Sequence, residues 1–350
     1  MSELLYEVDT LAGLEELASE EISSHGGSIT HRAPGVVQFT HPQVEALLPH
    51  LNTALSAYAV VPFDVPRPRA LLGDQHFRVL LQHVKFAIGV MRRFSPCPTQ
   101  RPQPPATLLL AAAGAETTVM QRLRDALAQH THTQPVSAEG ELLVRVRRAA
   151  VGWEVLIRLT KRPLAARPWR RCQFHGTLQA TVAYVVAQFS APQPTDVFLN
   201  VACGAGSILF ERARIGPAQR LIGCDTSPSA LRCARLNAVA YKDCYGGVDF
   251  ELHDWDATAL PLPEGSIDAI CADLPFGHQV GSHVENVKLY PAILREAARV
   301  ARPGARLVLL STEVRLLEEV IRAQSLWQPL TRLRVNLGGL LPLIVALERR

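Results

Sequence analysis

Apolar and polar residues between positions 172 and 350 follow two alternating patterns. Short apolar runs of strand length stand at 196–203, 220–225, 267–275 and 305–312. Apolar positions recur with helical spacing at 177–189, 289–301 and 313–324, and two final strand-like runs, 331–339 and 341–349, meet at a glycine-containing turn. This alternation predicts a doubly wound, mainly parallel α/β sheet whose final pair includes an antiparallel strand. Ligands of such a sheet bind at the carboxyl ends of its strands.

Residues 1–171 show a different succession of patterns. Residues 3–62 predict a small α+β unit in the order β-α-β-α, and residues 107–160 predict a second one in the order β-α-β-β. Between them, five prolines fall within 96–105, where neither a helix nor a central strand can form. The sequence therefore predicts two α+β units ahead of the α/β domain.

Composition places the chain among globular proteins of several domains. Of its 350 residues, 48 % are hydrophobic and 19 % are charged, which excludes disordered, collagen-like and coiled-coil proteins. The first residues lack the basic and apolar regions of a secretory signal, and no apolar run is long enough to span a membrane. Seven cysteines without a CxxC pair predict reduced thiols rather than a disulfide scaffold or structural zinc. We therefore expect a cytoplasmic protein without a membrane segment.

A glycine turn follows the first strand of the α/β domain, in the segment Asn200-Val-Ala-Cys-Gly-Ala-Gly206. Gly204 and Gly206 permit a tight strand-to-helix turn and let a ligand approach the backbone. The glycines come earlier and are sparser than in the dinucleotide fingerprint GxGxxG. The segment predicts a cofactor loop, and the alternative is an ordinary βα turn.

Acidic residues follow the next two strands. Asp225 can accept hydrogen bonds from both hydroxyls of a ribose, and Thr226 beside it can cap the helix that follows. Asp256 can accept the amino group of an adenine, with Trp255 beside the ring, and Asp254 competes for the same role. The alternatives are a helix N-cap for the first carboxylate and a plain loop acid for the second.

The segment Asp273-Leu-Pro-Phe-Gly277 directly follows the fourth strand and predicts a catalytic loop. The exocyclic amine of a nucleobase is a poor nucleophile because its lone pair is conjugated with the ring. Its N–H groups therefore need acceptors close to a methyl donor, and the Asp273 carboxylate and the Leu274 carbonyl can supply them. Pro275 fixes the loop, and Phe276 offers a face on which a base can stack. The alternative is a strand-end turn with a core phenylalanine.

The formal net charge of +4 is unevenly distributed. It resolves into −4 over residues 1–144, +8 over 145–171, which holds nine basic residues and one acid, and 0 over 172–350. Trp153 and Trp169 lie in the basic segment, and basic side chains next to aromatics suit phosphate contact and base stacking. The segment predicts an RNA contact, and the alternative is a solvated hairpin face. The residues expected to contact RNA are Lys161, Arg162, Arg167, Arg170 and Arg171.

Together these segments resemble the THUMP-domain RNA methyltransferases, over nearly the whole chain. NVACGAGSILFERA resembles the cofactor loop of that family, DLPFGHQVGS its catalytic loop, and LYPAILREAARVARPGARLVLL the helix and strand that follow. VLIRLTKRPLAARPWR resembles the junction between the THUMP and catalytic domains, and LYEVDTLAGLEELASEEI the ferredoxin-like domain. The similarity is strongest to the tRNA guanine-N2 methyltransferases. Asn200 and Val201 depart from the acid and proline with which the family's cofactor loop usually begins.

The resemblance implies a ferredoxin-like domain at 1–65, a THUMP-like RNA-binding domain at 66–165 and a Rossmann-like class I methyltransferase domain at 166–350. It further implies S-adenosylmethionine as the donor and a guanine in the acceptor-stem region of tRNA as the target, held by the first two domains. Direct transfer requires no metal, and we expect a monomer, with an activator subunit left open. The alternatives are methylation of rRNA guanine or of adenine N6, and a catalytically decayed protein that binds RNA as a scaffold.

Two sets of residues define the expected active site. The catalytic residues are Asp273, Leu274, Pro275 and Phe276. The cofactor-binding residues are Asn200, Ala202, Cys203, Gly204, Gly206, Asp225, Thr226, Trp255, Asp256 and Asp273.

Overall fold

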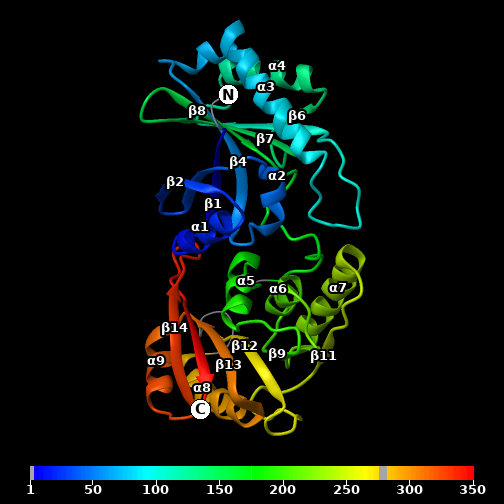
Figure 1. The fold of residues 1–350 in the computed structure, drawn as a ribbon, viewed down its shortest axis with the longest axis vertical. Coiled ribbons are helices and arrows are strands. Elements are labelled where there is room, and N and C mark those ends of the chain that lie inside the picture. Colours follow the sequence, from blue (N-terminus) through cyan, green and yellow to red (C-terminus); the bar gives the residue numbers. More distant parts are fainter. Residues whose placement is uncertain (1–3, 175, 276–281) are drawn as a thin grey trace. The chain divides into compact units, whose positions relative to one another are not determined.

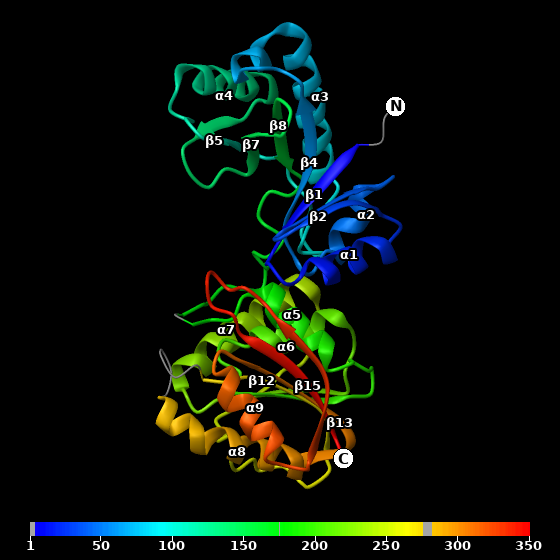
Figure 2. The same cartoon turned by 90° about the vertical axis from the view of Figure 1, so that its left-hand side faces the viewer.

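The computed structural model describes residues 4–174, 176–275 and 282–350. The chain forms two compact units, residues 1–166 and residues 167–350. Each unit has a sheet of its own, with eight strands in the first and seven in the second (Figures 1 and 2). Within the described ranges, no helix is both long and apolar enough to cross a membrane.

The first part of the N-terminal unit has the order βαββαβ. Its elements are β1 (Leu5–Thr10), α1 (Glu15–Ser24), β2 (Ser28–Ala33), β3 (Val36–Thr40), α2 (Val44–Leu47) and β4 (Ala54–Phe63). These strands lie in the order β4-β1-β3-β2, and each neighbouring pair is antiparallel. This is the split β-α-β arrangement of a ferredoxin-like fold.

The second part of this unit continues the same sheet. Its elements are α3 (Asp74–Met91), β5 (Thr107–Ala112), α4 (Thr118–Thr131), β6 (Gln134–Val136), β7 (Leu142–Arg148) and β8 (Trp153–Arg158). Strand β4 pairs with β1 along one edge and with β8 along the other, so the sheet runs on as β4-β8-β7-β5-β6. The expected boundary between residues 65 and 66 thus falls within one continuous sheet.

One face of this sheet carries the main core, and the other carries a small apolar cluster with ion pairs. Buried side chains of α1 to α4, such as Ile22, Leu80 and Leu123, pack with the inward side chains of the strands in a single cluster. On the opposite face of β1, the fully buried carboxylate of Glu7 accepts hydrogen bonds from the Arg147 guanidinium at 2.7 and 2.8 Å. Part of the positive charge of segment 145–171 is therefore paired within the unit itself, at Arg145, Arg147 and Lys161.

The C-terminal unit alternates helices and strands as the sequence predicts. Its elements are α5 (Ala180–Phe189), β9 (Val197–Val201), α6 (Ser207–Ile215), β10 (Arg220–Cys224), α7 (Pro228–Tyr245), β11 (Glu251–His253), β12 (Ile267–Asp273), α8 (His283–Val300), β13 (Ala301–Ser311), α9 (Val314–Arg322), β14 (Trp327–Arg334) and β15 (Leu343–Arg349). Helices α5 to α7 cover one face of the sheet, and α8 and α9 cover the other (Figure 2).

The strand order of the C-terminal unit is β11-β10-β9-β12-β13-β15-β14. The first five strands are parallel, and β15 runs antiparallel to both of its neighbours. This confirms the predicted doubly wound sheet with an antiparallel strand near its end. The order reverses between β9 and β12, and the carboxyl ends of these two strands and of β10 meet at the position where such sheets bind ligands.

Local sequence signals fix the helices that begin beside this switch point. Ser227 caps α7 by accepting a hydrogen bond from the Ala230 amide at 3.3 Å, and Pro228 occupies the first helical position. Ser282 and Glu285 form a reciprocal capping box at the start of α8. Helix α8 therefore begins six residues before the predicted 289–301 and includes Pro291.

Candidate active site

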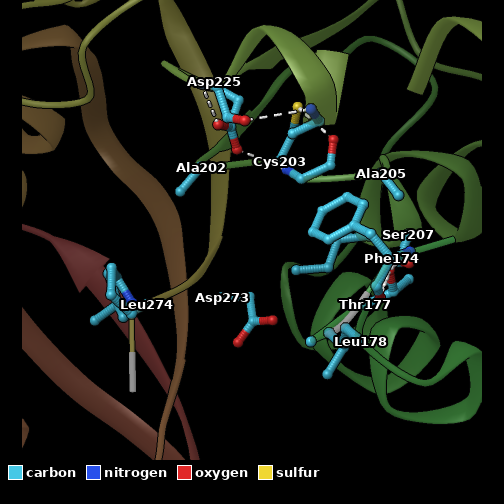
Figure 3. Close-up of a pocket in the computed structure, with 16 residues that line it drawn as sticks. Phe174, Thr177, Leu178, Ala202, Cys203, Ala205, Ser207, Asp225, Asp273 and Leu274 are labelled. Atoms are coloured by element: carbon cyan, nitrogen blue, oxygen red, sulfur yellow. Dashed lines mark hydrogen bonds between the residues drawn. The ribbon is translucent and has the colours of Figure 1, made fainter. Parts of the chain in front are cut away.

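A cavity of about 260 Å³ opens at the carboxyl ends of β9, β10 and β12 (Figure 3). It brings together the glycine turn after β9, Asp225 after β10 and the Asp273 segment at the end of β12. The residues that line it are Phe174, Gly176, Thr177, Leu178, Ala202, Cys203, Gly204, Ala205, Ser207, Ile208, Asp225, Ser227, Ala230, Asp273, Leu274 and Pro275.

The glycine turn needs its glycines for conformation and for space. Gly204 and Gly206 have φ angles of 56° and 84°, in the left-handed region. A Cβ atom on Gly206 would lie 2.4 Å from the ring of buried Phe210. Ala202 also has a positive φ of 49°. The turn therefore exposes its backbone to the cavity and leads directly into the N-terminus of α6.

Asp225 is held in place by two backbone amides. One carboxylate oxygen accepts a hydrogen bond from the Gly204 amide at 2.8 Å, and the other accepts one from the Ser227 amide at 2.8 Å. Ser227, rather than Asp225, caps the helix. A carboxylate has about four acceptor positions, so Asp225 can still accept hydrogen bonds from a ligand in the cavity.

The Asp273 carboxylate faces the cavity, and few hydrogen bonds offset the cost of its burial. Its Oδ1 atom is buried and has no hydrogen-bond partner among the described residues. Burial raises the pKa of Asp273 from 3.8 to about 7. The next residue is anchored, since the Leu274 amide donates to the Leu310 carbonyl of β13 at 2.9 Å. An uncompensated carboxylate beside a fixed backbone can accept hydrogen bonds from a bound substrate.

The chain before α5 forms a wall of the cavity that the sequence analysis missed. Figure 3 shows Phe174, Thr177 and Leu178 on the side of the cavity opposite Leu274. The Thr177 hydroxyl accepts from the Phe174 amide at 2.9 Å and donates to the Phe174 carbonyl at 2.7 Å, which closes a tight turn. These residues precede the first strand of the domain and follow no spacing that points to a ligand.

A disulfide between Cys172 and Cys233 ties this wall to α7. The Asn237 side chain reinforces the tie by donating to the carbonyls of Cys172 at 2.9 Å and of Ala205 at 3.0 Å. The expectation of reduced thiols was wrong for this pair, which lies 61 residues apart in sequence but has its Cα atoms 5.3 Å apart. Cys203, Cys224 and Cys271 are free thiols and are buried, as the apolar sequence around them indicates.

Asn200 lies in the sheet beneath the cavity rather than on its lining. It is fully buried, and its side-chain amide donates to the carbonyls of Cys271 at 3.1 Å and of Val201 at 3.3 Å. The Asn200 amide therefore bridges β9 and β12. Its side chain supports the strand ends that carry the glycine turn and Asp273.

Thr226, Trp255 and Asp256 also fall outside the set of residues that line the cavity. The Trp255 indole stacks on the His253 ring with centroids 4.0 Å apart. The Asp256 carboxylate accepts hydrogen bonds from the amide and the hydroxyl of Thr258, which lowers its pKa. A role for these residues at the cofactor stays a prediction.

The five basic residues expected to contact RNA separate into two groups. Arg162 and Arg171 are exposed, and Lys161 is partly exposed and pairs with Glu141 at 2.8 Å. Arg167 and Arg170 point inward instead. Arg167 is buried and Arg170 is partly buried, and a contact of either with RNA stays a prediction.

Arg167 and Arg170 stabilise the interior of the C-terminal unit. Arg167 forms a buried ion pair with Glu211 at 2.9 Å, because the fully buried carboxylate needs a counter-charge. Arg170 donates to the Leu178 carbonyl at 2.8 Å and to the Ser207 hydroxyl at 3.1 Å. Trp169 between them is fully buried and cannot stack on a base. Phe276 and Gly277, expected in the catalytic loop, lie outside the described residues.

A family model described as RMKL-like, methyltransferase domain (UPF0020) matches residues 167–342, about half of the chain. The chain belongs to this methyltransferase family. The match begins at the first residue of the C-terminal unit and includes the whole cavity lining.

Curated proteins with related sequences match just under half of the chain. The tRNA (guanine(6)-N(2))-methyltransferase THUMP3 of Bos taurus is 36 % identical over 183 residues, which cover 49 % of this chain and 36 % of that protein. The U6 snRNA (guanine-N(2))-methyltransferase THUMPD2 of Bos taurus is 33 % identical over 155 residues, which cover 43 % of this chain and 28 % of that protein. The chain thus matches about a third of the length of these relatives.

Solved structures match the whole chain. TrmN from Thermus thermophilus is 22 % identical with a TM-score of 0.72, over 99 % of this chain and 100 % of that one. A possible methylase from Clostridium difficile 630 is 14 % identical with a TM-score of 0.67, over 100 % of this chain and 99 % of that one. At these identities the likeness shows the fold, which agrees with the predicted Rossmann-like methyltransferase domain preceded by α+β parts.

The methyl donor implied by the family, S-adenosylmethionine, fits the residues of the cavity. Gly204 lines the cavity, and a Cβ atom there would extend to within 3.6 Å of the Phe174 ring, whereas Gly206 serves the conformation of the turn. Asp225 is held by its two amide partners with acceptor positions left for hydroxyl groups, and the Asp273 Oδ1 atom, which has no partner within residues 4–174, 176–275 and 282–350, offers a further acceptor.

Proposed function

We propose that this chain methylates the exocyclic N2 atom of a guanine in the acceptor-stem region of tRNA. The observation that supports this most is the Asp273 carboxylate, which faces the cavity beside the Leu274 backbone with a buried oxygen that has no partner in the described part of the chain. Relatives that match just under half of this chain are named as guanine-N2 methyltransferases of tRNA or of U6 snRNA. These names favour guanine N2 over adenine N6 as the acceptor and leave another RNA as the second candidate substrate.

In the proposed reaction, Asp273 and the Leu274 carbonyl accept hydrogen bonds from the two N–H groups of the guanine amine. This turns the nitrogen lone pair out of the ring plane, towards the donor. S-adenosylmethionine, when bound, supplies the electrophilic methyl group. The nitrogen forms a bond to that carbon as the carbon–sulfur bond breaks, and the methylated amine then loses one proton. A carboxylate whose pKa is about 7 can take up this proton near neutral pH.

The remaining residues of the cavity hold the donor in this proposal. Asp225 accepts hydrogen bonds from the ribose hydroxyls, and the backbone at Gly204 and Gly206 lies against the donor. Phe174 and Leu178 close the opposite wall and exclude water from the reacting atoms. Asn200 acts by keeping the ends of β9 and β12 together rather than by touching the donor.

We propose the N-terminal unit as the part that grips the tRNA, with the exposed Arg162 as one phosphate contact. We also propose a monomer that acts in the cytoplasm. Disulfides are rare in that compartment, so the Cys172–Cys233 bond bears directly on this part of the proposal. Alkylation of thiols in freshly lysed cells followed by mass spectrometry tests this, because a disulfide protected from alkylation would argue against the compartment.

The proposed reaction is tested by nucleoside analysis of RNA from cells that lack the gene. We expect N2-methylguanosine to disappear from one tRNA position and to return on expression of the wild type but not of Asp273→Ala. Loss of N6-methyladenosine with N2-methylguanosine unchanged would overturn the proposal. Loss from U6 snRNA or rRNA alone would assign the same chemistry to a different acceptor.

Calorimetry separates this proposal from a catalytically decayed scaffold. The purified chain should bind S-adenosylmethionine and transfer its methyl group to unmodified tRNA. A chain that binds tRNA but no donor at millimolar concentration would be a scaffold.

A further inference from the structure

The peptide group that carries the Leu274 carbonyl is bracketed by hydrogen bonds on both sides. On one side, the Leu274 amide donates to the Leu310 carbonyl at 2.9 Å. On the other, the Pro275 carbonyl accepts from the Asn286 side-chain amide at 2.9 Å and from the Tyr290 hydroxyl at 2.7 Å. Pro275 has no N–H of its own, so its carbonyl is the group through which this end of the segment can be fixed.

The two donors belong to a buried polar network at the start of α8. The Tyr290 hydroxyl also bonds the Ser311 hydroxyl at 2.8 Å, and the Ser311 oxygen accepts from the Glu313 amide at 2.9 Å. The Asn286 side-chain amide donates to the Glu313 carboxylate. The side chains of Asn286, Tyr290 and Ser311 are fully buried. The network thus links the Pro275 segment to the end of β13 and to α8.

Such a network costs stability compared with an apolar core. The Asn286 Oδ1 atom is buried and has no hydrogen-bond partner in the described part of the chain, which carries a desolvation penalty. Apolar side chains at 286 and 290 would fill the same space without this penalty. Two buried donors, Asn286 and Tyr290, converge on the Pro275 carbonyl despite this cost in stability. This indicates that the position of the Pro275 segment matters for function.

We propose that Asn286 and Tyr290 are positioning residues that hold the Leu274 carbonyl in the direction needed to accept the substrate amine. Residues 286 and 290 stand four apart on one face of α8, so a single rigid helix presents both donors. The Ser282–Glu285 capping box fixes the first turn of that helix just before Asn286. This inference rests on the proposed function, because the Leu274 carbonyl acts only if an amine is the acceptor.

The test compares Tyr290→Phe with Tyr241→Phe. Both tyrosines are buried in the C-terminal unit, and Tyr241 packs in the cluster of Trp169 and Phe210, away from the lining of the cavity. Tyr290→Phe keeps the ring and removes the hydroxyl. We expect it to lower kcat on tRNA by about 10- to 100-fold, because a small misplacement of a reacting group has effects of this size. The KM for S-adenosylmethionine should change little, and Tyr241→Phe should leave both constants near wild type.

A second readout does not depend on the substrate. Hydrogen exchange of the Leu274 amide should accelerate in Tyr290→Phe and in Asn286→Ala, and should stay unchanged in Tyr241→Phe. Unchanged exchange at Leu274, or equal kcat for the two tyrosine variants, would overturn the inference. A wild-type protein that transfers no methyl group to any RNA would overturn the proposed function instead, and with it the role assigned to the Leu274 carbonyl.

Discussion

The Asp225 carboxylate accepts a hydrogen bond from the Gly204 amide at 2.8 Å, across 21 residues of sequence. This bond joins the end of β10 to the glycine turn after β9, two features of the cavity that the sequence predicts. The same carboxylate that we propose for the ribose therefore also shapes the turn on which the donor lies.

Replacing Asp225 should weaken donor binding, because it removes both the proposed ribose contact and the hydrogen bond that shapes the glycine turn. We expect Asp225→Ala to lower the affinity for S-adenosylmethionine by about 10- to 100-fold, the range that corresponds to the loss of hydrogen bonds to a charged group. Isothermal titration calorimetry measures it. Glu264→Gln, which changes an exposed acid of the same unit outside the cavity lining, serves as the control. Equal affinities in the two variants would contradict the role of Asp225.

The pKa of Asp273 predicts how activity depends on pH. Burial raises this pKa to about 7, and only the ionised form can accept a proton from the amine. The single-turnover rate of methyl transfer should therefore rise with pH through about 7 and level off above it. Asp273→Ala should abolish transfer while leaving tRNA affinity nearly intact. Any residual rate of Asp273→Asn should be flat between about pH 6 and 8, because an amide does not titrate there.

The same residue should make stability fall as pH rises. Between about pH 4 and 7 the folded state keeps a proton on Asp273 that the unfolded state has released, so increasing pH favours unfolding. Asp273→Asn removes this dependence. The melting temperature of Asp273→Asn minus that of the wild type, measured without donor, should therefore increase from pH 5 to pH 8. A constant difference would show that the carboxyl has an ordinary pKa.

Asn200 offers a test of its role as a strand bridge. Asn200→Asp restores an acid at the start of the cofactor loop but replaces an amide that donates to the Cys271 carbonyl with an acceptor. We expect the free energy of unfolding in urea to fall by about 1–3 kcal/mol, the cost of leaving a buried polar group unpaired. An unchanged stability together with tighter donor binding would instead place residue 200 at the cofactor.

Adjacent arginines should respond differently to charge reversal. Arg171 is exposed, and its amide is fixed by the Asn237 side chain at 2.9 Å, so Arg171→Glu should weaken tRNA binding and reduce the salt slope by about 1. Arg170→Glu should lower the melting temperature and the donor affinity, because Arg170 bonds Leu178 and Ser207 on the cavity wall. Filter binding at several salt concentrations and thermal melting separate the two effects. Identical behaviour of the two variants would contradict this division.

The alternation of apolar runs was sufficient to predict the C-terminal sheet and the position of its ligand cavity. Asp225 and Asp273 could be placed together because the carboxyl ends of parallel strands meet at one edge. The wall formed by Phe174, Thr177 and Leu178 could not be predicted, since it depends on how the chain before α5 folds back over the sheet. Helix α3 was missed although Leu80, Val84 and Ile88 follow helical spacing, because the prolines on both sides of it favour a loop.

Charge was the least reliable guide. The basic segment 145–171 suggested a surface for RNA, yet Arg147 pairs with Glu7, which lies 140 residues away, and Arg167 pairs with Glu211. Net charge along the sequence cannot reveal partners that only the folded chain brings together. The position of Asn200 could not be predicted for a related reason, because a polar residue at a strand end can face the neighbouring strand as readily as a ligand; its contact with the cofactor stays a prediction.

The double pairing of β4 has a consequence for how the N-terminal unit opens. This ten-residue strand has a partner on each side: β1 pairs with residues 54–60 and β8 with residues 58–63. A protein shortened to begin at residue 66 would expose β8 as an unprotected edge, which is a template for self-association. Amide exchange should therefore detect residues 4–63 and 107–158 losing protection together, as one cooperative unit rather than as two independent domains.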